Sequence, residues 1–318
     1  MYHSKFASDL ENMLKTLRNA GLQMGGIEYF LTDFDNFCNV NFPEEATLTM
    51  EVAEGWIHNA TSESKAHMWR RVNAMKHLGK YQLSIGKAAY ISNLLIRKPR
   101  AEEPRLFNDE QLTEFFAKVD TQTKPTKTYP YSDIIYPVMF RLIYCCGLRS
   151  SEACNLQTEN IDLASGVLDI FRGKNRDRRI FMSDDIIELC LRFHKYYCKI
   201  IPDRTYFFQP SPTREFYKSA EITRDFDKIL RTTSFCNTPG KKFTPHGLRH
   251  LFAVQNIRKC AERGEDFSNW IQYLSKYMGH KNIQFTKHYL HITSQSLPVY
   301  SEKINRLGEG IGVLYVEE

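Results

Sequence analysis

The chain has 318 residues, of which 42% are hydrophobic and 25% are charged, and its formal net charge is +6. This composition is typical of a globular protein long enough for two domains. The apolar runs are shorter than the roughly 20 residues of a membrane helix, and the N-terminus lacks the apolar core of a signal peptide. We therefore expect a soluble, cytoplasmic protein with no membrane partner.

The eight cysteines include no C-x-x-C pair, the spacing typical of zinc or redox sites. Most of them stand among apolar neighbours, as in "LIYCCGL". We expect reduced thiols buried in the core, as in a reducing compartment.

Charge is distributed unevenly along the first hundred residues. Residues 1–63 hold three Lys or Arg against ten Asp or Glu, whereas residues 64–100 hold nine Lys or Arg and no acid. Such a run is often only a solvated face, but aromatic residues inside it favour a surface for nucleic-acid phosphates. The cations that we expect to contact phosphates are Lys65, Arg70, Arg71, Lys76, Lys80 and Lys87.

The same hundred residues show helical periodicity in four successive segments, which predicts a compact helical bundle. A segment with two prolines and mixed charge follows at 98–105 and predicts a linker. We therefore expect one domain at 1–100 and a second at 101–318. The four predicted helices lie within residues 6–21, 25–42, 49–60 and 63–86.

The second domain is predicted to be mostly helical, starting near Asn108, where Gln111 completes a capping box. In "CCGLRSSEACNL", Gly147 precedes a predicted helix. Arg149 and Glu152 are three residues apart, so we expect them to share a helical face. Taken alone, such a pair is more often a surface ion pair.

Residues 166–183, "GVLDIFRGKNRDRRIFMS", alternate in polarity on both sides of a polar turn and predict a β-hairpin with a cationic tip. Lys174 stands in that tip, where it either reaches a groove or is an ordinary solubilising charge. Residues 184–201 return to helical periodicity, and their first acids are interpreted as capping residues rather than metal ligands.

In "TPHGLRHLFAVQNI", Pro245 begins a predicted helix whose first turn carries His246 and Arg249 on one face. A helix N-terminus also favours bound phosphate. We expect His250 to point elsewhere, as a supporting or core histidine.

The stretch "MGHKNIQFTKHYLHI" at 278–292 contains three histidines and Tyr289. A zinc site formed by His280, His288, His291 and a cysteine is one interpretation, but no cysteine is near in the sequence. We also find no carboxylate cluster suited to two-metal nuclease chemistry, so no metal and no cofactor is expected.

Together, "GLRSSEACNL", "HGLRH" and "MGHKNIQFTKHY" resemble the three boxes of the tyrosine recombinases, the phage-integrase-like and Xer-like site-specific recombinases, over residues 140–295. The resemblance implies a mainly α fold with a small β-hairpin: an N-terminal helical core-binding (SAM-like) domain and a C-terminal mixed α/β catalytic domain. Asn160 departs from the aspartate frequent in the family, a difference that we assign to local structure. The implied catalytic residues are Arg149, Lys174, His246, Arg249, His280 and Tyr289.

The implied reaction cleaves and rejoins double-stranded DNA through a 3′-phosphotyrosyl bond, without metal or ATP. Two arginines are suited to clamp the phosphate oxygens on which charge develops. A phenol with a pKa near 10 is about 4 kcal/mol from its ionised form at pH 7, so a base is needed, and His246 is the candidate. Lys174 would protonate the departing 5′-oxygen, and His280 would bind the phosphate or orient Tyr289.

The family usually works as a tetramer on two DNA sites, in integration, excision, transposition or dimer resolution. The tail at 306–318 either docks on a neighbouring subunit or packs on its own. Two alternatives remain: a DNA-binding protein of the same fold that no longer cleaves, and a strand-passing enzyme like the type IB topoisomerases. No expected catalytic position is replaced, which disfavours the first, and the compact length and His280 disfavour the second.

Overall fold

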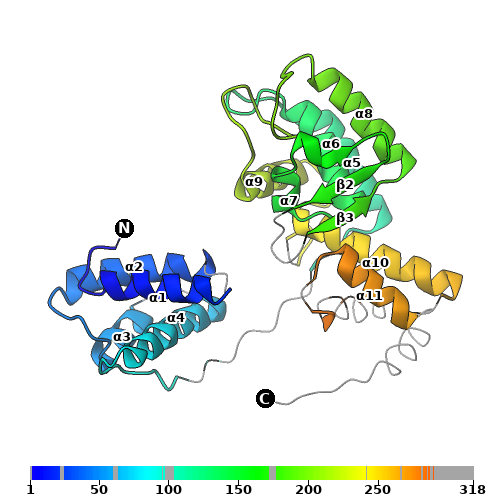
Figure 1. Cartoon of the computed structure of the whole chain (residues 1–318). Helices are drawn as coiled ribbons and strands as arrows, with labels where there is room; N and C mark the ends of the chain where they lie inside the picture. The colour runs from blue at the N-terminus through cyan, green and yellow to red at the C-terminus, as the bar shows by residue number, and fades with distance from the viewer. Residues whose placement is uncertain are drawn as a thin grey trace. The chain divides into compact units, whose positions relative to one another are not determined.

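The computed structural model forms two compact units, residues 1–102 and 103–318, which are described separately (Figure 1). No helix within the described residues is long and apolar enough to cross a membrane. The cysteines are all free, and five of the eight are buried, so the predicted core thiols are largely confirmed. The structure describes residues 2–21, 25–59, 64–94, 96, 104–171, 177–240, 242–265, 267–280, 282–284, 286 and 289.

The first unit is the predicted helical bundle. Helix α4 contacts each of the other three, and together they enclose a core built around Trp56, Phe34 and Phe6. The rings of Phe34 and Trp56 meet edge to face, with centroids 5.4 Å apart. The described helices of this unit are α1 (Ala7–Asn19), α2 (Gly25–Asn41), α3 (Met50–His58) and α4 (Lys65–Ser84).

The second unit is mainly helical with one small antiparallel sheet, so the expected fold class is confirmed (Figure 1). Its described helices are α5 (Asp109–Gln122), α6 (Ser132–Cys145), α7 (Ser150–Cys154), the 3₁₀ helix η1 (Thr158–Asn160), α8 (Asp184–Tyr197), α9 (Ser219–Leu230), α10 (Pro245–Arg263) and α11 (Phe267–Tyr277). Its strands, in sheet order, are β1 (Ile161–Asp162), β2 (Val167–Ile170) and β3 (Arg178–Phe181).

The predicted hairpin corresponds to β2 and β3, with Val167 opposite Phe181 and Ile170 opposite Arg178. Its tip, residues 172–176, lies outside the described residues. Strand β1 is not predicted from the sequence, because two residues are too few to show an alternating pattern. The capping box of α5 is present as expected: the Gln111 backbone donates to the Asn108 side chain over 2.8 Å, and the Gln111 side chain accepts from the Asn108 backbone.

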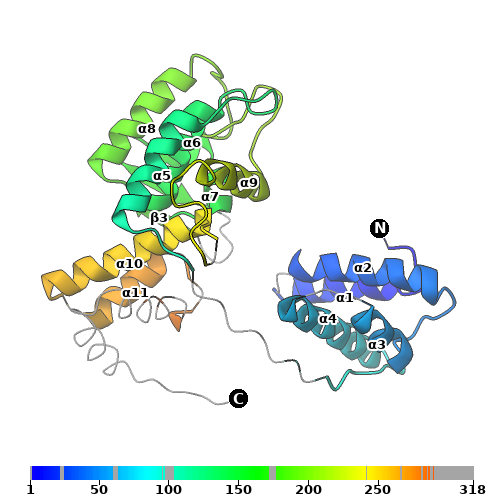
Figure 2. The ribbon, with the colours of Figure 1, turned by 180° about the vertical axis from the view of Figure 1, so that it is seen from behind.

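Helix α6 forms the centre of the second unit, and α5, α8 and α10 pack against it (Figure 2). Its buried side chains include Met139, Phe140, Leu142 and Ile143, which enter one continuous apolar core. The carboxyl end of α6 therefore has a fixed position against α10, and both lead into the segments that carry the candidate site.

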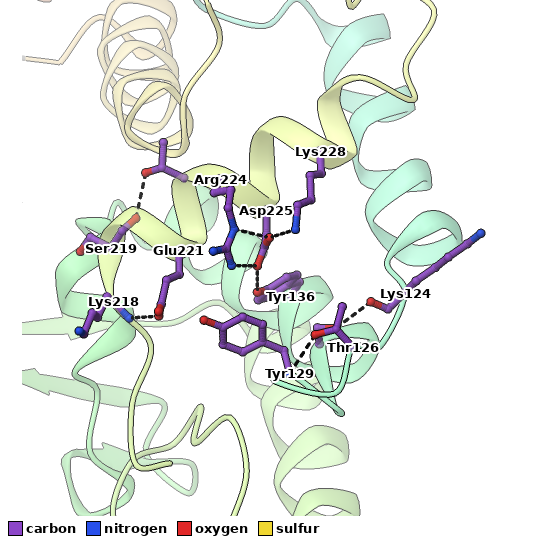
Figure 3. A network of polar contacts seen from close by, with 12 residues as sticks. Lys124, Thr126, Tyr129, Tyr136, Lys218, Ser219, Glu221, Arg224, Asp225 and Lys228 are labelled. Carbon is purple, nitrogen blue, oxygen red and sulfur yellow. Dashed lines mark hydrogen bonds and ion pairs between the residues drawn. The ribbon is translucent and has the colours of Figure 1, made fainter. Parts of the chain in front are cut away.

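A polar network fixes α9 beside α6 (Figure 3). The carboxylate of the buried Asp225 accepts hydrogen bonds from the Tyr136 hydroxyl at 2.7 Å, from Lys228 at 2.8 Å and from Arg224 at 3.2 Å. Burial raises the pKa of Asp225, but hydrogen bonds from Arg224 and Lys228 lower it more, so the net shift is downward. A buried carboxylate with these donors stabilises the fold, and we assign it no chemical role.

Gly147 connects α6 to the site, and its backbone geometry excludes other residues. Its φ is +63°, in the left-handed region, and an added Cβ would lie 2.6 Å from a ring carbon of Phe252. The carbonyl of Gly147 accepts a hydrogen bond from Arg249. Both the turn and the close approach therefore require glycine.

We expect Gly147→Ala to lower the free energy of unfolding of the second unit by roughly 2–4 kcal/mol, from backbone strain and overpacking against Phe252. Gly55→Ala in α3 is the matched control, because its Cβ would make only ordinary contacts of 3.8 Å or more, with Phe37 and Phe42. That control should be neutral or stabilise by up to about 1 kcal/mol. Denaturant unfolding followed by circular dichroism measures both, and equal effects would contradict the assignment.

Candidate active site

Arg149 and Glu152 are paired, but not in the way predicted. Arg149 has extended backbone angles (φ −73°, ψ 150°) and precedes α7 instead of sharing a helical face with Glu152. Glu152 still accepts from the Arg149 guanidinium and from its backbone N–H, both at 2.7 Å. The other guanidinium nitrogen, Nη2, donates to the carbonyl of Gly279 at 2.8 Å. Arg149 is thus fixed from both sides.

Glu152 is the common partner of three guanidiniums. Arg178 of β3 donates to both carboxylate oxygens, at 2.8 and 2.7 Å, and the side chains of both residues are almost completely buried. Arg249 lies 3.6 Å away. Burial raises the pKa of Glu152, but hydrogen bonds and charge from Arg178, with the Arg149 backbone, outweigh it and hold the pKa at about 2. The carboxylate is therefore ionised at neutral pH.

Helix α10 begins as predicted, with the Thr244 side chain accepting from the Gly247 backbone and Pro245 in the first turn. Arg249 is 1% exposed. It donates to the carbonyl of Gly147 at 2.5 Å and to that of Met278. Burial and the neighbouring Arg149 lower its pKa, yet a guanidinium stays protonated in proteins. Arg249 therefore joins three segments that are far apart in the sequence.

His280 follows Gly279, whose φ is +62°. Its Nδ1 lies 2.8 Å from the Thr286 hydroxyl, and its Nε2 lies 3.4 Å from Arg249 Nη2. Burial and then the charges of Arg249 and Arg149 lower the pKa of His280 to about 3, so the ring is neutral at pH 7. Because arginine can only donate, Nε2 accepts and Nδ1 carries the proton.

Tyr289 belongs to the same group of side chains as Arg149, Arg249 and His280, which we call the pocket, and 3% of its surface is exposed. Its ring is nearly parallel to that of His280, with centroids 6.2 Å apart. Burial raises the pKa of Tyr289 to about 12, although the nearby charges of Arg249 and Arg149 act to lower it. The phenol that the sequence singles out is therefore close to both arginines.

The Tyr289 hydroxyl is hydrogen-bonded to His250, which the sequence analysis directs elsewhere. His250 Nδ1 lies 2.7 Å from the hydroxyl oxygen, and the two rings have centroids 5.3 Å apart. The prediction that His250 points away is wrong for a geometric reason. Four residues along a helix amount to a rotation of only about 40°, so His250 lies nearly on the face of His246.

His246 lies beside His250, with ring centroids 4.4 Å apart in an edge-to-face arrangement. Its side chain remains exposed, unlike that of Arg249. The protein atoms crowded around the ring, followed by the charges of Arg249 and Arg149, lower its pKa. His246 is thus a largely neutral imidazole at the surface of the pocket.

Arg178 is the second residue of the site that the sequence analysis does not assign, although strand periodicity could have indicated it. On β3, Arg178 and Ile180 occupy one face and Arg179 and Phe181 the other. Ile180 is fully buried and Phe181 is 66% exposed, so alternation places Arg178 on the inner face.

Four further predictions concern residues at or beyond the edge of the described site. Asn160 ends η1 and donates to Gln157 over 3.3 Å, a local contact as expected. Lys174 lies outside the described residues. The same holds for His288 and His291 of the zinc interpretation and for the tail at 306–318.

The six cations expected to contact DNA differ in their surroundings. Lys65, Arg70 and Lys80 are exposed on α4. Lys76 is half-buried and donates to the Leu94 carbonyl, and Lys87 forms an ion pair with Asp9 at 2.8 Å.

Arg71 does not belong with the exposed cations. It is 7% exposed, lies 4.4 Å from the ring centroid of Trp56, and pairs with Asp33 at 3.0 Å. The prediction that it faces DNA is therefore wrong. Helical periodicity explains the error, because Arg71 shares its face with the buried Met75 and Leu78.

Comparison with known proteins identifies the family. Residues 106–296 match the phage integrase family, and the chain belongs to it. The XerD tyrosine recombinase of Staphylococcus saprophyticus is 23% identical over 275 residues, covering 85% of this chain and 86% of XerD. The XerA tyrosine recombinase of Pyrococcus furiosus is 31% identical over 172 residues, covering 54% of this chain and 55% of XerA. The resemblance to tyrosine recombinases is thereby confirmed.

A solved structure shows the same fold. The XerH site-specific recombinase, bound to a palindromic difH substrate in a post-cleavage complex, aligns with a TM-score of 0.61 at 19% identity. The alignment covers 86% of this chain and 77% of XerH.

We expect Glu152→Gln to lower the free energy of unfolding by about 3–5 kcal/mol, because it leaves two buried guanidiniums and one half-buried guanidinium without their shared counter-charge. Glu188→Gln is the control, since Glu188 and Arg192 form an exposed pair 3.7 Å apart. That change should stay within about 0.5 kcal/mol of wild type. Denaturant unfolding at pH 7 compares the two variants.

The pH dependence gives a second check on the same carboxylate. Its pKa is depressed in the folded state, so its stabilisation is complete above the unfolded pKa of about 4.3 and is lost as the pH falls through about 2. The difference between wild type and Glu152→Gln should be constant from pH 5 to 7 and shrink below about 4. A difference unchanged down to pH 2 would contradict this.

Proposed function

We propose that this protein is a site-specific DNA recombinase that cleaves and rejoins double-stranded DNA through a 3′-phosphotyrosyl bond to Tyr289. The observation that supports this most directly is that Tyr289 lies in the same chain as the two arginines and its ring is 6.2 Å from that of His280, which Arg249 contacts. The charges of Arg149 and Arg249 reach its hydroxyl and act to lower its pKa. Membership of the phage integrase family supports the same conclusion. A DNA substrate is also in keeping with a cytoplasmic location.

Arg149 and Arg249 would hold the phosphate and stabilise the charge that develops on its non-bridging oxygens. Each guanidinium carries five N–H donors, and the bonds to Glu152 and to the backbone carbonyls leave further donors available. Those bonds also fix the guanidiniums of Arg149 and Arg249 before DNA binds. Such preorganised donors typically make the largest contribution to the rate enhancement.

Tyr289 is a poor nucleophile in the state described here. A pKa near 12 makes the phenolate roughly 7 kcal/mol less favourable than the phenol at pH 7. Removing the proton during attack, in a pocket of positive charge, would offset most of this deficit. Lys174 would protonate the leaving 5′-oxygen. His280, neutral and held by Thr286, would orient the phenol ring beside it, and His246 at the exposed side would contact the phosphate.

The two units would share the DNA. The unit at 1–100 would bind the phosphate backbone through its basic block, and the unit at 101–318 would carry out the chemistry. Since the similar XerH structure holds a palindromic DNA site, we propose that this protein also acts as a homo-oligomer, a tetramer on two sites.

We expect wild-type protein to form a denaturant-resistant adduct with nicked duplexes, and Tyr289→Phe to form none. The nick lets a short product strand diffuse away, which traps the covalent state. A pool of nicked duplexes of randomised sequence, recovered on the tagged protein under denaturing conditions, supplies a substrate whatever the target sequence is. Tyr196→Phe is the matched control, since Tyr196 is 55% exposed on α8, and it should react like wild type.

The other outcomes distinguish the alternatives. EDTA should not change the yield. A reversible shift without an adduct indicates a silent DNA-binding protein, and relaxation of any supercoiled plasmid by monomers indicates a topoisomerase. Either result would contradict the proposal.

We expect neighbouring arginines of α4 to have separate effects. Arg70→Ala should weaken binding to duplex DNA and reduce the slope of log K against log salt by about 0.9, the loss of one phosphate contact, without changing stability. Arg71→Ala should instead destabilise the first unit, because it removes the partner of Asp33 and Trp56. Salt titrations of binding and thermal melts measure the two effects, and a reversed pattern would contradict the placement.

A further inference from the structure

The histidine that contacts the nucleophile is not the one that the motif spacing proposes as the base. His250 Nδ1 lies 2.7 Å from the Tyr289 hydroxyl, a normal distance for a direct hydrogen bond. His246, the sequence-based candidate, contacts the ring of His250. His280 directs its Nδ1 to Thr286 and its Nε2 to Arg249.

We propose that His250 is a catalytic residue that accepts the phenolic proton of Tyr289 when the tyrosine attacks DNA. This inference rests on the proposed function. A general base must lie within hydrogen-bond reach of the proton that it removes, and His250 meets this condition before DNA is bound. Imidazole is also the side chain whose basicity suits neutral pH.

The position of His250 in the fold supports this role. It is half-buried on α10, immediately after the almost fully buried Arg249, so the helix that fixes an arginine of the pocket also fixes the base. The ring of His246 packs against its ring edge to face. The base and the arginine therefore keep fixed positions relative to each other on the side of the phenol.

The proton transfers balance in both directions. The Tyr289 oxygen forms a bond to the scissile phosphorus while the bond from phosphorus to the 5′-oxygen breaks. The phenolic proton passes to His250 Nδ1, and the 5′-oxygen receives a proton from Lys174. Religation reverses each transfer: the 5′-hydroxyl attacks, Lys174 takes back its proton, and His250 returns its proton to the phenolate.

The test compares His250→Asn with wild type in single-turnover cleavage of a nicked duplex recovered with the wild-type protein. Asparagine places a hydrogen-bond acceptor near the position of Nδ1 but cannot take a proton at neutral pH. We expect cleavage at pH 7 to slow by ~10²–10³-fold, within the usual contribution of a general base, with DNA binding and melting temperature unchanged. Adduct formation by the wild-type protein tests the proposed function itself. A wild-type protein without an adduct would contradict that function, whereas normal cleavage by His250→Asn would contradict only the role of His250.

The pH profile separates proton transfer from simple positioning. Without its base, the variant can react only through Tyr289 that has already lost its proton to the solvent. Because that ionised fraction grows tenfold per pH unit below the pKa, its rate should rise about tenfold per pH unit from pH 7 to 9, more steeply than wild type. Among the residues that the structure describes, the other charged and titratable groups around the pair are His246, His280, Arg149 and Arg249, and Glu152 and Arg178 contact these arginines or each other. His246→Asn, measured alongside, should lower the rate through the lost phosphate contact but keep the slope of the wild-type pH profile.

A modified substrate identifies the side of the reaction on which His250 acts. A sulfur in place of the bridging 5′-oxygen leaves without protonation, so it should restore cleavage by Lys174→Ala but not by His250→Asn. Three results would overturn the proposal: wild-type rates in His250→Asn, a uniform loss with the wild-type pH profile, or rescue of His250→Asn by sulfur. A steep profile in His246→Asn alone would instead assign the proton to His246.

Discussion

The second unit depends on one buried carboxylate. Glu152 lies within 3.6 Å of three guanidiniums, which come from the turn before α7, from β3 and from α10. Without it, Arg149, Arg178 and Arg249 would repel one another in a medium that screens charge poorly. A pKa near 2 shows how strongly these cations favour its ionised form. The same interaction holds three segments of the chain together and gathers the positive charge that phosphate binding requires.

The positive charge of the pocket is preorganised by the backbone as well. Arg249 donates to the carbonyls of Gly147 and Met278, and Arg149 donates to that of Gly279. The two glycines have positive φ, so the chain can turn these carbonyls toward the arginines where other residues would be strained. Rigid donors need little reorganisation when charge develops, so under the proposed function the same residues would serve fold stability and catalysis.

Sequence reasoning succeeds where a local rule decides the structure. The start of α5 at its capping box, the start of α10 at Pro245 and the hairpin all follow from short-range patterns. Arg71 and His250 are misjudged and Arg178 is not assigned, although periodicity already places Arg71 and Arg178 on inner faces and His250 near the face of His246. In these cases charge and motif receive more weight than geometry. The bond from Tyr289 to His250 is beyond such rules, because it joins residues 39 apart whose meeting depends on tertiary packing.

The three histidines of the pocket differ in what surrounds them, and that difference assigns their work. His246 is exposed, and its ring packs against that of His250. His280 is neutral, and both ring nitrogens have partners within the protein. His250 contacts the hydroxyl itself. A buried phenol with a raised pKa reacts slowly with adventitious electrophiles, and a base already in contact with it can act as soon as a phosphate enters between the arginines. With the roles proposed for Tyr289 and His250, the resting pocket would both protect the phenol and hold it ready for attack.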